Sequence, residues 1–291
     1  MTKRIFAGDE LAASWRCFDW RENFLAPGLS ILQALTGQGQ TASGAGLSRA
    51  EAYDRCIGET AELLALARMQ AQGDNFEATR DGIAAHADPA EARASAICEA
   101  HERRAVAAWW LGHAPARPIA PHWLLHSGTA ELLARARRGA ALKRPTDFWL
   151  IEMGHGPHVV IARSMSLERQ DPVLGYGVHR DPARAAEKAL RELLLMELNL
   201  MELLAARAHG SDGAYQSVQD RIRDFARRGP QLFPDQPPVV PGPPVEGRDL
   251  DWFDRPPHLC DLLPGGEIEV WLCRPDTPPP RFSRETGLPY L

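Results

Sequence analysis

The sequence predicts an α+β fold built from duplicated strand–turn–helix units. Three stretches look like copies of one another, and each joins a glycine-containing turn to an alanine-rich helix. They occupy residues 44–62, 81–103 and 175–197. Aligned on Ala50, Ala90 and Ala183, the copies lie 40 and 93 residues apart. Because a solenoid requires a fixed period, this uneven spacing favours copies inside one α+β domain over a repeat array.

The helices of the three copies begin at recognisable N-terminal signals. Ser48 followed three residues later by Glu51 has the form of a capping box, which predicts a helix over residues 49–72. Asp-Pro pairs open the other two copies, and proline suits the first helical position. Helices are therefore also expected over residues 89–111 and 182–207.

The remaining elements are shorter. Residues 9–19 fit a helix or a strand equally well. We expect a turn at 37–46, a strand within 76–87, a basic helix at 130–142, a hairpin of strands at 147–152 and 158–163, and a last strand at 267–273. Prolines dominate residues 229–257, which predicts an extended linker or loop because proline removes a backbone donor.

These elements predict four segments along the chain. They are an N-terminal segment at 1–36, a core at 37–228, the proline-rich linker or loop at 229–257, and a C-terminal strand and proline-rich tail at 258–291. The strand after the linker suggests that the chain returns to the core.

The composition excludes several classes of function. A net charge of −5 argues against a general nucleic-acid or membrane surface. The start of the chain lacks a secretory signal, and no run reaches the roughly 18 apolar residues of a membrane span. The five cysteines are far apart and form no Cys-x-x-Cys pair, so neither a zinc site nor a disulfide framework is expected. A reducing cytoplasm is the expected compartment.

The first two copies end in paired glutamates at the same offset. The pairs are Glu59 with Glu62 and Glu99 with Glu102. The third copy has Glu192, but Leu195 stands in the second position. Glutamates at i and i+3 lie on one helix face, roughly 5–6 Å apart, and such like charges repel. Four carboxylates in one region suit Mg²⁺, which takes oxygen ligands and shares them with nucleotide phosphates.

Neighbouring residues leave alternatives open. Arg103 follows the second pair and could reach a phosphate with its planar guanidinium. His86 and His179 stand at comparable points before two of the helices, and each could cap the helix, contact a phosphate or line a turn. The alternative to a metal site is a duplicated fold whose glutamates are solvated on the helix surfaces.

At these residues the sequence resembles the YcaO-like family. That family is similar in having a Ser-Gly-x-Gly segment and an alanine-rich helix ending in Glu-x-x-Glu-Arg, then a Gly-Leu-Ala-Ala strand and a second Glu-x-x-Glu-Arg. The matching positions here are Ser43–Gly46, Glu59 and Glu62, Gly82–Ala85, and Glu99, Glu102 and Arg103. The third copy, with Gly177 and Glu192, looks like the later helix of that fold. The resemblance covers residues 37–291.

The resemblance implies an α+β fold in which the duplicated units surround a central site for ATP and Mg²⁺. It implies that the metal ligands are Glu59, Glu62, Glu99 and Glu102. It places Arg103, Ser43, His86 and Glu91 against ATP or its phosphates, and Glu192 in the wall of the site. In that family ATP phosphorylates a peptide-bond oxygen. A Cys, Ser or Thr side chain then closes an azoline, or external sulfide gives a thioamide.

The resemblance also implies partners. The substrate would be a ribosomal precursor peptide or a protein, with a separate partner that binds its leader or delivers sulfur, in a homo- or hetero-oligomer. The alternative is a degenerate member that serves as a non-catalytic scaffold in a maturation complex. Three departures from the family pattern favour it: Ala45 replaces a frequent lysine, Leu63 replaces a common arginine, and Ala87 replaces a polar residue.

Overall fold

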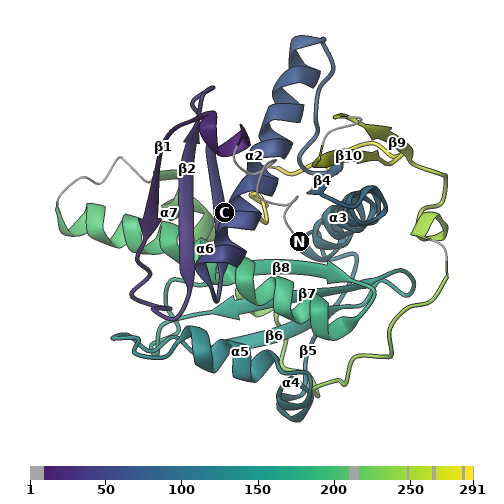
Figure 1. Cartoon of the computed structure of the whole chain (residues 1–291). Helices are drawn as coiled ribbons and strands as arrows, with labels where there is room; N and C mark the ends of the chain where they lie inside the picture. Colours follow the sequence, from purple (N-terminus) through teal and green to yellow (C-terminus); the bar gives the residue numbers. More distant parts are fainter. Residues whose placement is uncertain (1–9, 210–215, 248, 264–266, 284–285, 291) are drawn as a thin grey trace. The chain divides into compact units, whose positions relative to one another are not determined.

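The computed structural model describes residues 10–209, 216–247, 249–263, 267–283 and 286–290. The chain divides into two compact units. Unit 1 comprises Met1–Glu22, Leu29–Arg103 and Arg248–Pro279, and unit 2 comprises Asn23–Gly28, Arg104–Gly247 and Pro280–Leu291. Both units combine helices with antiparallel sheets (Figure 1), so the α+β prediction is confirmed.

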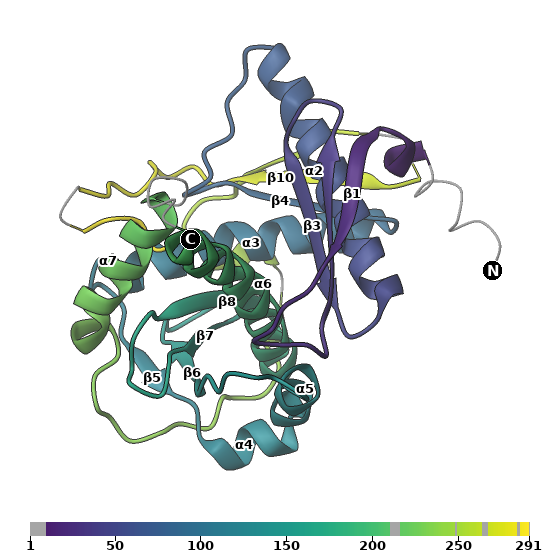
Figure 2. The same cartoon turned by 90° about the vertical axis from the view of Figure 1, so that its left-hand side faces the viewer.

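The first sheet of unit 1 precedes and supports the first long helix. Its strands are β1 (Trp15–Arg21), β2 (Ser30–Thr36) and β3 (Thr41–Gly46), in the order β1-β2-β3. Helix α2 (Arg49–Ala71) packs against it, as Figure 2 shows. The Ser48 side chain accepts from the N–H of Glu51, so the predicted cap and helix are confirmed. Leu32 and Ala42 meet Ala52 and Cys56 in the core between them.

The second sheet of unit 1 joins distant parts of the chain. It contains β4 (Gly82–His86), β10 (Glu269–Arg274) and β9 (His258–Asp261), in the order β4-β10-β9. The chain beyond the proline-rich segment thus returns to a sheet. Ala61 and Ala65 of α2 pack on Ile83 and Val270 of this sheet. The second repeated helix, α3 (Pro89–Trp110), follows β4, and the 3-10 helix η1 (Asp249–Trp252) precedes β9.

Unit 2 contains one four-stranded antiparallel sheet. Its strands, in order, are β5 (Ala116–Pro118), β6 (Thr146–Ile151), β7 (His158–Ser164) and β8 (Val173–His179). Its helices are α4 (Pro121–His126), α5 (Thr129–Ala136), α6 (Pro182–Ala208) and α7 (Gln216–Leu232). Helix α6 packs on β7 and β8. The pairing of β6 with β7 confirms the predicted hairpin.

The three copies share one geometry within their units. The helix packs so closely on its strand that a Cβ atom would collide with the helix backbone. A Cβ on Gly44 would lie 1.9 Å from the oxygen of Ala52, and one on Gly177 would lie 2.3 Å from the oxygen of Ala185. Small residues in these strands are therefore required by helix packing.

This requirement explains one wrong prediction. Residues 37–46 were expected to form a turn because they are rich in glycine, serine and threonine, but Thr41–Gly46 form strand β3, paired with β2. The expected boundary between residues 36 and 37 accordingly falls between two paired strands.

Three other elements differ in extent from the prediction. The strand expected within 76–87 is limited to Gly82–His86, and the basic helix ends at Ala136 rather than near residue 142. The segment at 229–257 begins as helix, because α7 continues through Pro230 to Leu232. Proline in the last turn is accommodated there, and the N–H of Phe233 still donates to the oxygen of Gly229.

None of the described helices is both long enough and apolar enough to cross a membrane.

Candidate functional site

The paired glutamates of unit 1 bind the outer edges of two strands. In the described sheets β3 and β4 each pair with a single strand, so their outer N–H groups need other acceptors. Glu59 accepts from the N–H of Ser43 at 2.7 Å, and Glu99 accepts from the N–H of Ile83 at 3.0 Å. In both pairs the glutamate lies 16 residues after its donor. The repeat seen in the sequence is thus a repeated strand–helix hydrogen bond.

Glu62 connects the first copy to the second. It lies on α2, and its carboxylate accepts from the N–H of Ala85 on β4 at 2.8 Å. The other oxygens of Glu59 and Glu62 receive no hydrogen bond from the described part of the chain. Each of these two carboxylates therefore keeps one oxygen for a further ligand.

Burial and mutual repulsion perturb these carboxylates. Removal from water raises the pKa of Glu59 from 4.5 to about 7, against the lowering effect of the Ser43 N–H. Burial also raises the pKa of Glu62 well above its usual value, and the charges of Glu99 and Glu59 raise it further. The N–H of Ala85 and the charge of Arg103 act in the opposite direction. The pKa of Glu62 thus shows that Glu59, Glu62 and Glu99 form one electrostatic cluster, which we call the carboxylate cluster.

Arg103 is the cation that the structure places in this cluster. Its Nη2 atom donates to Glu99 Oε1 at 2.7 Å, and both side chains are about three-quarters buried. Glu102 lies one turn beyond Glu99 on α3 and is half-buried. The structure thus brings together three of the four expected metal ligands, Glu59, Glu62 and Glu99, with Arg103. The part of Glu102 in the metal site stays a prediction.

The other predicted phosphate contacts have local partners. Ser43 is half-buried in β3, with its N–H on Glu59. His86 is exposed at the end of β4, and its Nδ1 accepts from the N–H of Asp88 at 2.9 Å. Glu91 is exposed in the first turn of α3. The contact of His86 with Asp88 is that of a turn residue, and the phosphate role of these three residues stays a prediction.

The third copy shows the same hydrogen bond in unit 2. Glu192 of α6 accepts from the N–H of Tyr176 on β8 at 2.9 Å, again 16 residues after the donor. His179 accepts from the N–H of Asp181, as His86 does from Asp88. The place of Glu192 in the wall of an ATP site stays a prediction.

The chemistry of the carboxylate cluster fits Mg²⁺. All of its ligands are oxygens, the donors that Mg²⁺ prefers. In the described part of the chain no three acidic, histidine or cysteine side chains form a ready metal cage. Such a cage is not needed, because Mg²⁺ is commonly held by one or two carboxylates together with water and substrate phosphates. A cation would also oppose the burial and the repulsion that together raise the pKa of Glu62.

Two charged features escaped the sequence analysis. Arg55 of α2 is exposed and donates through Nη1 to the backbone oxygen of Ala45. In unit 2, Glu197 is fully buried and bound by Arg137. Nothing in the local spacing indicates either contact, since each joins separate elements.

Comparison with known proteins identifies a matching family model and several similar folds. The family model described as YcaO cyclodehydratase, ATP- and Mg²⁺-binding, matches residues 61–263. A search of curated protein sequences finds no match. Three similar solved structures have TM-scores of 0.57 to 0.65. At 12–15% identity they show the fold alone.

The first of these structures is the E. coli microcin synthetase McbBCD complex with pro-MccB17 bound, with 12% identity, a TM-score of 0.62 and coverage of 91% of this chain and 88% of that one. The second is a heterocyclase in complex with substrate and cofactor, with 14% identity and a TM-score of 0.65; the match covers 94% of this chain but 52% of that one. The third is YcaO from Methanopyrus kandleri bound with AMPPCP and Mg²⁺, with 15% identity, a TM-score of 0.57 and coverage of 92% and 86%.

Proposed function

The chain belongs to the YcaO family, and on that premise we propose that it uses Mg²⁺ and ATP to activate a peptide backbone amide for cyclodehydration. The family is described as an ATP- and Mg²⁺-binding cyclodehydratase, so ATP and Mg²⁺ are the cofactors of the family. The observation that carries the proposal to this chain is the carboxylate cluster. It gathers acidic oxygens in a half-buried place where Arg103 is the cation described.

The residues of unit 1 would divide the work of binding. Glu59, Glu62, Glu99 and Glu102 would hold Mg²⁺, which supplies positive charge to the phosphates of ATP. Arg103 is held by Glu99 at 2.7 Å, so its guanidinium is oriented before ATP arrives. This prior orientation of Arg103 favours catalysis, because charges that are positioned in advance need no rearrangement as the phosphoryl group moves. Ser43, His86 and Glu91 are the further proposed contacts to ATP.

The proposed reaction balances as a loss of water driven by ATP. The γ-phosphoryl group moves to the amide oxygen and ADP leaves. The side-chain oxygen or sulfur of a Cys, Ser or Thr of the peptide loses its proton and adds to the amide carbon. Phosphate then departs with the former amide oxygen, and the amide nitrogen loses its proton to form the C=N bond of the azoline. An amide is a poor electrophile, and its oxygen leaves readily only once it is phosphorylated. Sulfide in place of the side chain would give a thioamide.

The solved relatives suggest the partners. One of them is a multi-subunit synthetase with a bound pro-peptide. We propose a precursor peptide or protein as the substrate and a separate leader-binding or sulfur-delivery protein as the partner, in the cytoplasm.

One position favours a second function, that of a non-catalytic scaffold. Leu63, which replaces the common arginine, packs against the core cluster that contains Leu32 and Cys56, so this place holds an apolar contact instead of a charge. Against the scaffold function stands Arg55, whose guanidinium lies at Ala45. A positive charge is thereby kept near Ala45.

The test is turnover of ATP with Mg²⁺ and a candidate precursor peptide. We compare the wild type with the double variant Glu99→Gln plus Glu102→Gln. Glutamine keeps an acceptor for the N–H of Ile83, so the fold is retained while the charge is lost. The double variant should lose about a hundredfold or more in turnover. Asp54→Asn, an exposed change on α2, is the matched control and should leave turnover unchanged.

Product mass and nucleotide binding complete the test. Ring closure removes the mass of one water from the peptide, whereas thioamide formation replaces the mass of oxygen by that of sulfur. Equal turnover by wild type and the double variant would refute the role of the carboxylate cluster. No binding of ATP in calorimetry at millimolar Mg²⁺ would instead establish the scaffold.

A further inference from the structure

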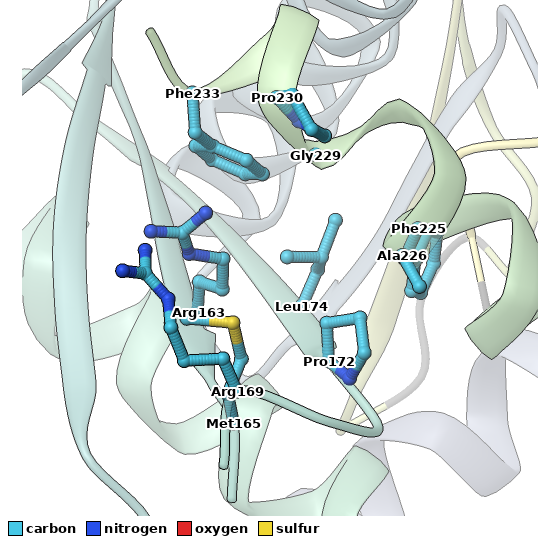
Figure 3. Close-up of a pocket in the computed structure, with 10 residues that line it drawn as sticks. All are labelled: Arg163, Met165, Arg169, Pro172, Leu174, Phe225, Ala226, Gly229, Pro230 and Phe233. Atoms are coloured by element: carbon cyan, nitrogen blue, oxygen red, sulfur yellow. The ribbon is translucent and has the colours of Figure 1, made fainter. Parts of the chain in front are cut away.

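Unit 2 contains a cavity that the proposed ATP chemistry does not use. Its volume is about 350 Å³, within the range of small-ligand sites. It lies between the β7–β8 region and helix α7 (Figure 3). We propose that this cavity binds the carboxyl-terminal residue of a peptide, with the apolar side chain inside and the carboxylate at Arg169.

Most of the cavity wall is apolar. The apolar residues of the wall are Met165, Pro172, Leu174, Phe225, Ala226, Pro230 and Phe233. A mostly apolar lining with few polar groups is typical of a ligand site, where the apolar surface gives affinity and the polar groups fix orientation. The volume is at the small end of the range, so it suits one side chain rather than a long segment.

One of the two arginines in the wall is already neutralised. Arg163 is 8% exposed, and it forms a two-point ion pair with Asp147, with distances of 3.0 Å and 2.5 Å. Its guanidinium also lies 4.1 Å from the ring centre of Phe233, a cation–π contact. Arg163 therefore serves to hold the wall, with its charge balanced by Asp147.

Arg169 is the second arginine in the wall, and it differs from Arg163 both in burial and in the balance of its charge. It is exposed, and no carboxylate in the described part of the chain forms an ion pair with it. Its φ is +60°, in the left-handed region that disfavours residues other than glycine. The turn that holds it is fixed by bonds from its N–H to the oxygen of Ser166 and from the N–H of Gln170 to the Ser166 hydroxyl. In Figure 3 the side chains of Arg163 and Arg169 extend in the same direction beside the apolar wall.

The charge of the cavity selects the ligand. Among the wall residues and their ion-pair partners, Arg163 and Asp147 cancel, which leaves the positive charge of Arg169. Glu168 and Asp171 lie in the same turn, so a singly charged carboxylate fits this place better than a doubly charged phosphate. A guanidinium binds a carboxylate through two parallel hydrogen bonds. A free amino acid would also bring an ammonium group close to Arg169, which repels it. An apolar residue whose nitrogen is acylated, as at a peptide carboxyl terminus, satisfies both conditions.

This inference is independent of the proposed function. All residues of the cavity belong to unit 2, and the test needs neither ATP nor Mg²⁺. Failure of the proposed cyclodehydration would leave the cavity and its ligand unaffected.

The test uses the full chain and N-acetyl-L-phenylalanine as the probe, with binding followed by calorimetry. Its uncharged amide should bind about tenfold more weakly or worse, because the charged hydrogen bonds to Arg169 are lost. Free L-phenylalanine should also bind more weakly. Inorganic phosphate should not displace the probe.

Variants separate the ligand contact from the fold. Arg169→Gly removes the guanidinium and relieves the positive φ, so it should weaken binding about tenfold without lowering the melting temperature. Arg169→Lys keeps the charge and should retain more of the affinity. Gly229→Leu adds a side chain to the cavity wall where a Cβ meets no atom within 4 Å, and it should block the probe. Arg223→Gln, an exposed change on α7 outside the cavity, should bind as the wild type does.

Four results would overturn the inference. They are equal binding of the acid and its amide, undiminished binding by Arg169→Gly, undiminished binding by Gly229→Leu, and displacement of the probe by phosphate. Absence of any binding of the probe would overturn it as well.

Discussion

Unit 1 and unit 2 each bury glutamate, but they treat its charge in opposite ways. In unit 2, Glu197 is fully buried and its carboxylate meets Arg137 at 2.5 Å and Arg144 at 3.4 Å. The hydroxyl of Ser164 also donates to it at 2.5 Å. The chain itself thus supplies the counter-charges and the hydrogen bond that stabilise this buried carboxylate.

In the carboxylate cluster of unit 1, negative charges outnumber positive ones. Glu62 lies among two other glutamates, and Arg103 is the one cation that lowers its pKa. The backbone N–H groups of Ser43, Ile83 and Ala85 satisfy one oxygen of each carboxylate but cancel no full charge. A glutamate that serves the fold comes with its counter-charge, whereas the cluster sets one cation, Arg103, against three glutamates. The missing positive charge is what the proposed Mg²⁺ would bring.

The largest effect is expected in unit 2. Glu197→Gln leaves the guanidiniums of Arg137 and Arg144 buried without a carboxylate, which should lower the free energy of unfolding by about 3–5 kcal/mol. Urea unfolding followed by circular dichroism measures this loss. Glu187→Gln, which breaks a partly exposed pair with Arg191 on the same helix, is the control and should cost less than about 1 kcal/mol. Equal losses in both variants would contradict the assigned role of Glu197.

The next effect is a dependence on pH in unit 1. Folding raises the pKa of Glu59 from 4.5 to about 7, so between these values the folded protein holds a proton that the unfolded chain releases. The free energy of unfolding in the absence of Mg²⁺ should therefore fall as the pH rises from about 4.5 to 7, by up to about 3 kcal/mol.

Glu59→Gln isolates this contribution. Glutamine accepts from the N–H of Ser43 but does not titrate, so the variant should lack the decline and should be the more stable protein at pH 8. The measurement is the difference in unfolding free energy between wild type and variant at several pH values. A difference that is constant over the range would show that the pKa of Glu59 is not raised by folding.

The contrast between the units also explains what could be predicted from the sequence. Signals that lie within a few residues were interpreted correctly: the Ser48 cap and the Asp181-Pro182 helix start. The environment of Glu197 could not be predicted from the sequence, because Arg137 and Ser164 lie 60 and 33 residues away along the chain. A buried ion pair between distant elements leaves no periodic trace.

Strand β3 and helix α7 show a second limit. The sequence of β3 is rich in small polar residues, as turns are, because α2 packs directly on Gly44 and a Cβ there would lie 1.9 Å from the oxygen of Ala52. Close packing against α2 thus requires small residues in β3, and small residues are usually typical of loops. In α7, tertiary contacts of Phe225 with Trp110 and of Phe233 with Trp149 hold a helix end that contains Pro230, against its local preference.

A smaller effect, of opposite sign to that of Glu197→Gln, is expected for Glu62→Gln. The variant keeps an acceptor for the N–H of Ala85 and removes a charge whose burial, together with repulsion from Glu99 and Glu59, raises the pKa of Glu62. Without Mg²⁺, at a pH where Glu62 is ionised, it should be more stable than the wild type because no buried charge remains. Melting temperatures with and without Mg²⁺ and ATP measure the effect. Destabilisation by Glu62→Gln would mean that the carboxylate serves the fold as Glu197 does, and the contrast between the units would fail.

The smallest effect is expected for Glu192→Gln, which tests whether the third copy shares the role of the first two. Its bond to the N–H of Tyr176 matches that of Glu99 to Ile83, and Leu195 stands where the first two copies have their second glutamate. Since glutamine preserves the acceptor, the unfolding free energy should change by less than about 0.5 kcal/mol. Ligands that bind the folded state alone stabilise it, and this stabilisation by Mg²⁺ and ATP should persist in Glu192→Gln but fall in Glu99→Gln. Equal loss in both variants would make the third copy a metal-binding copy, and Leu195 would then no longer distinguish it from the other two.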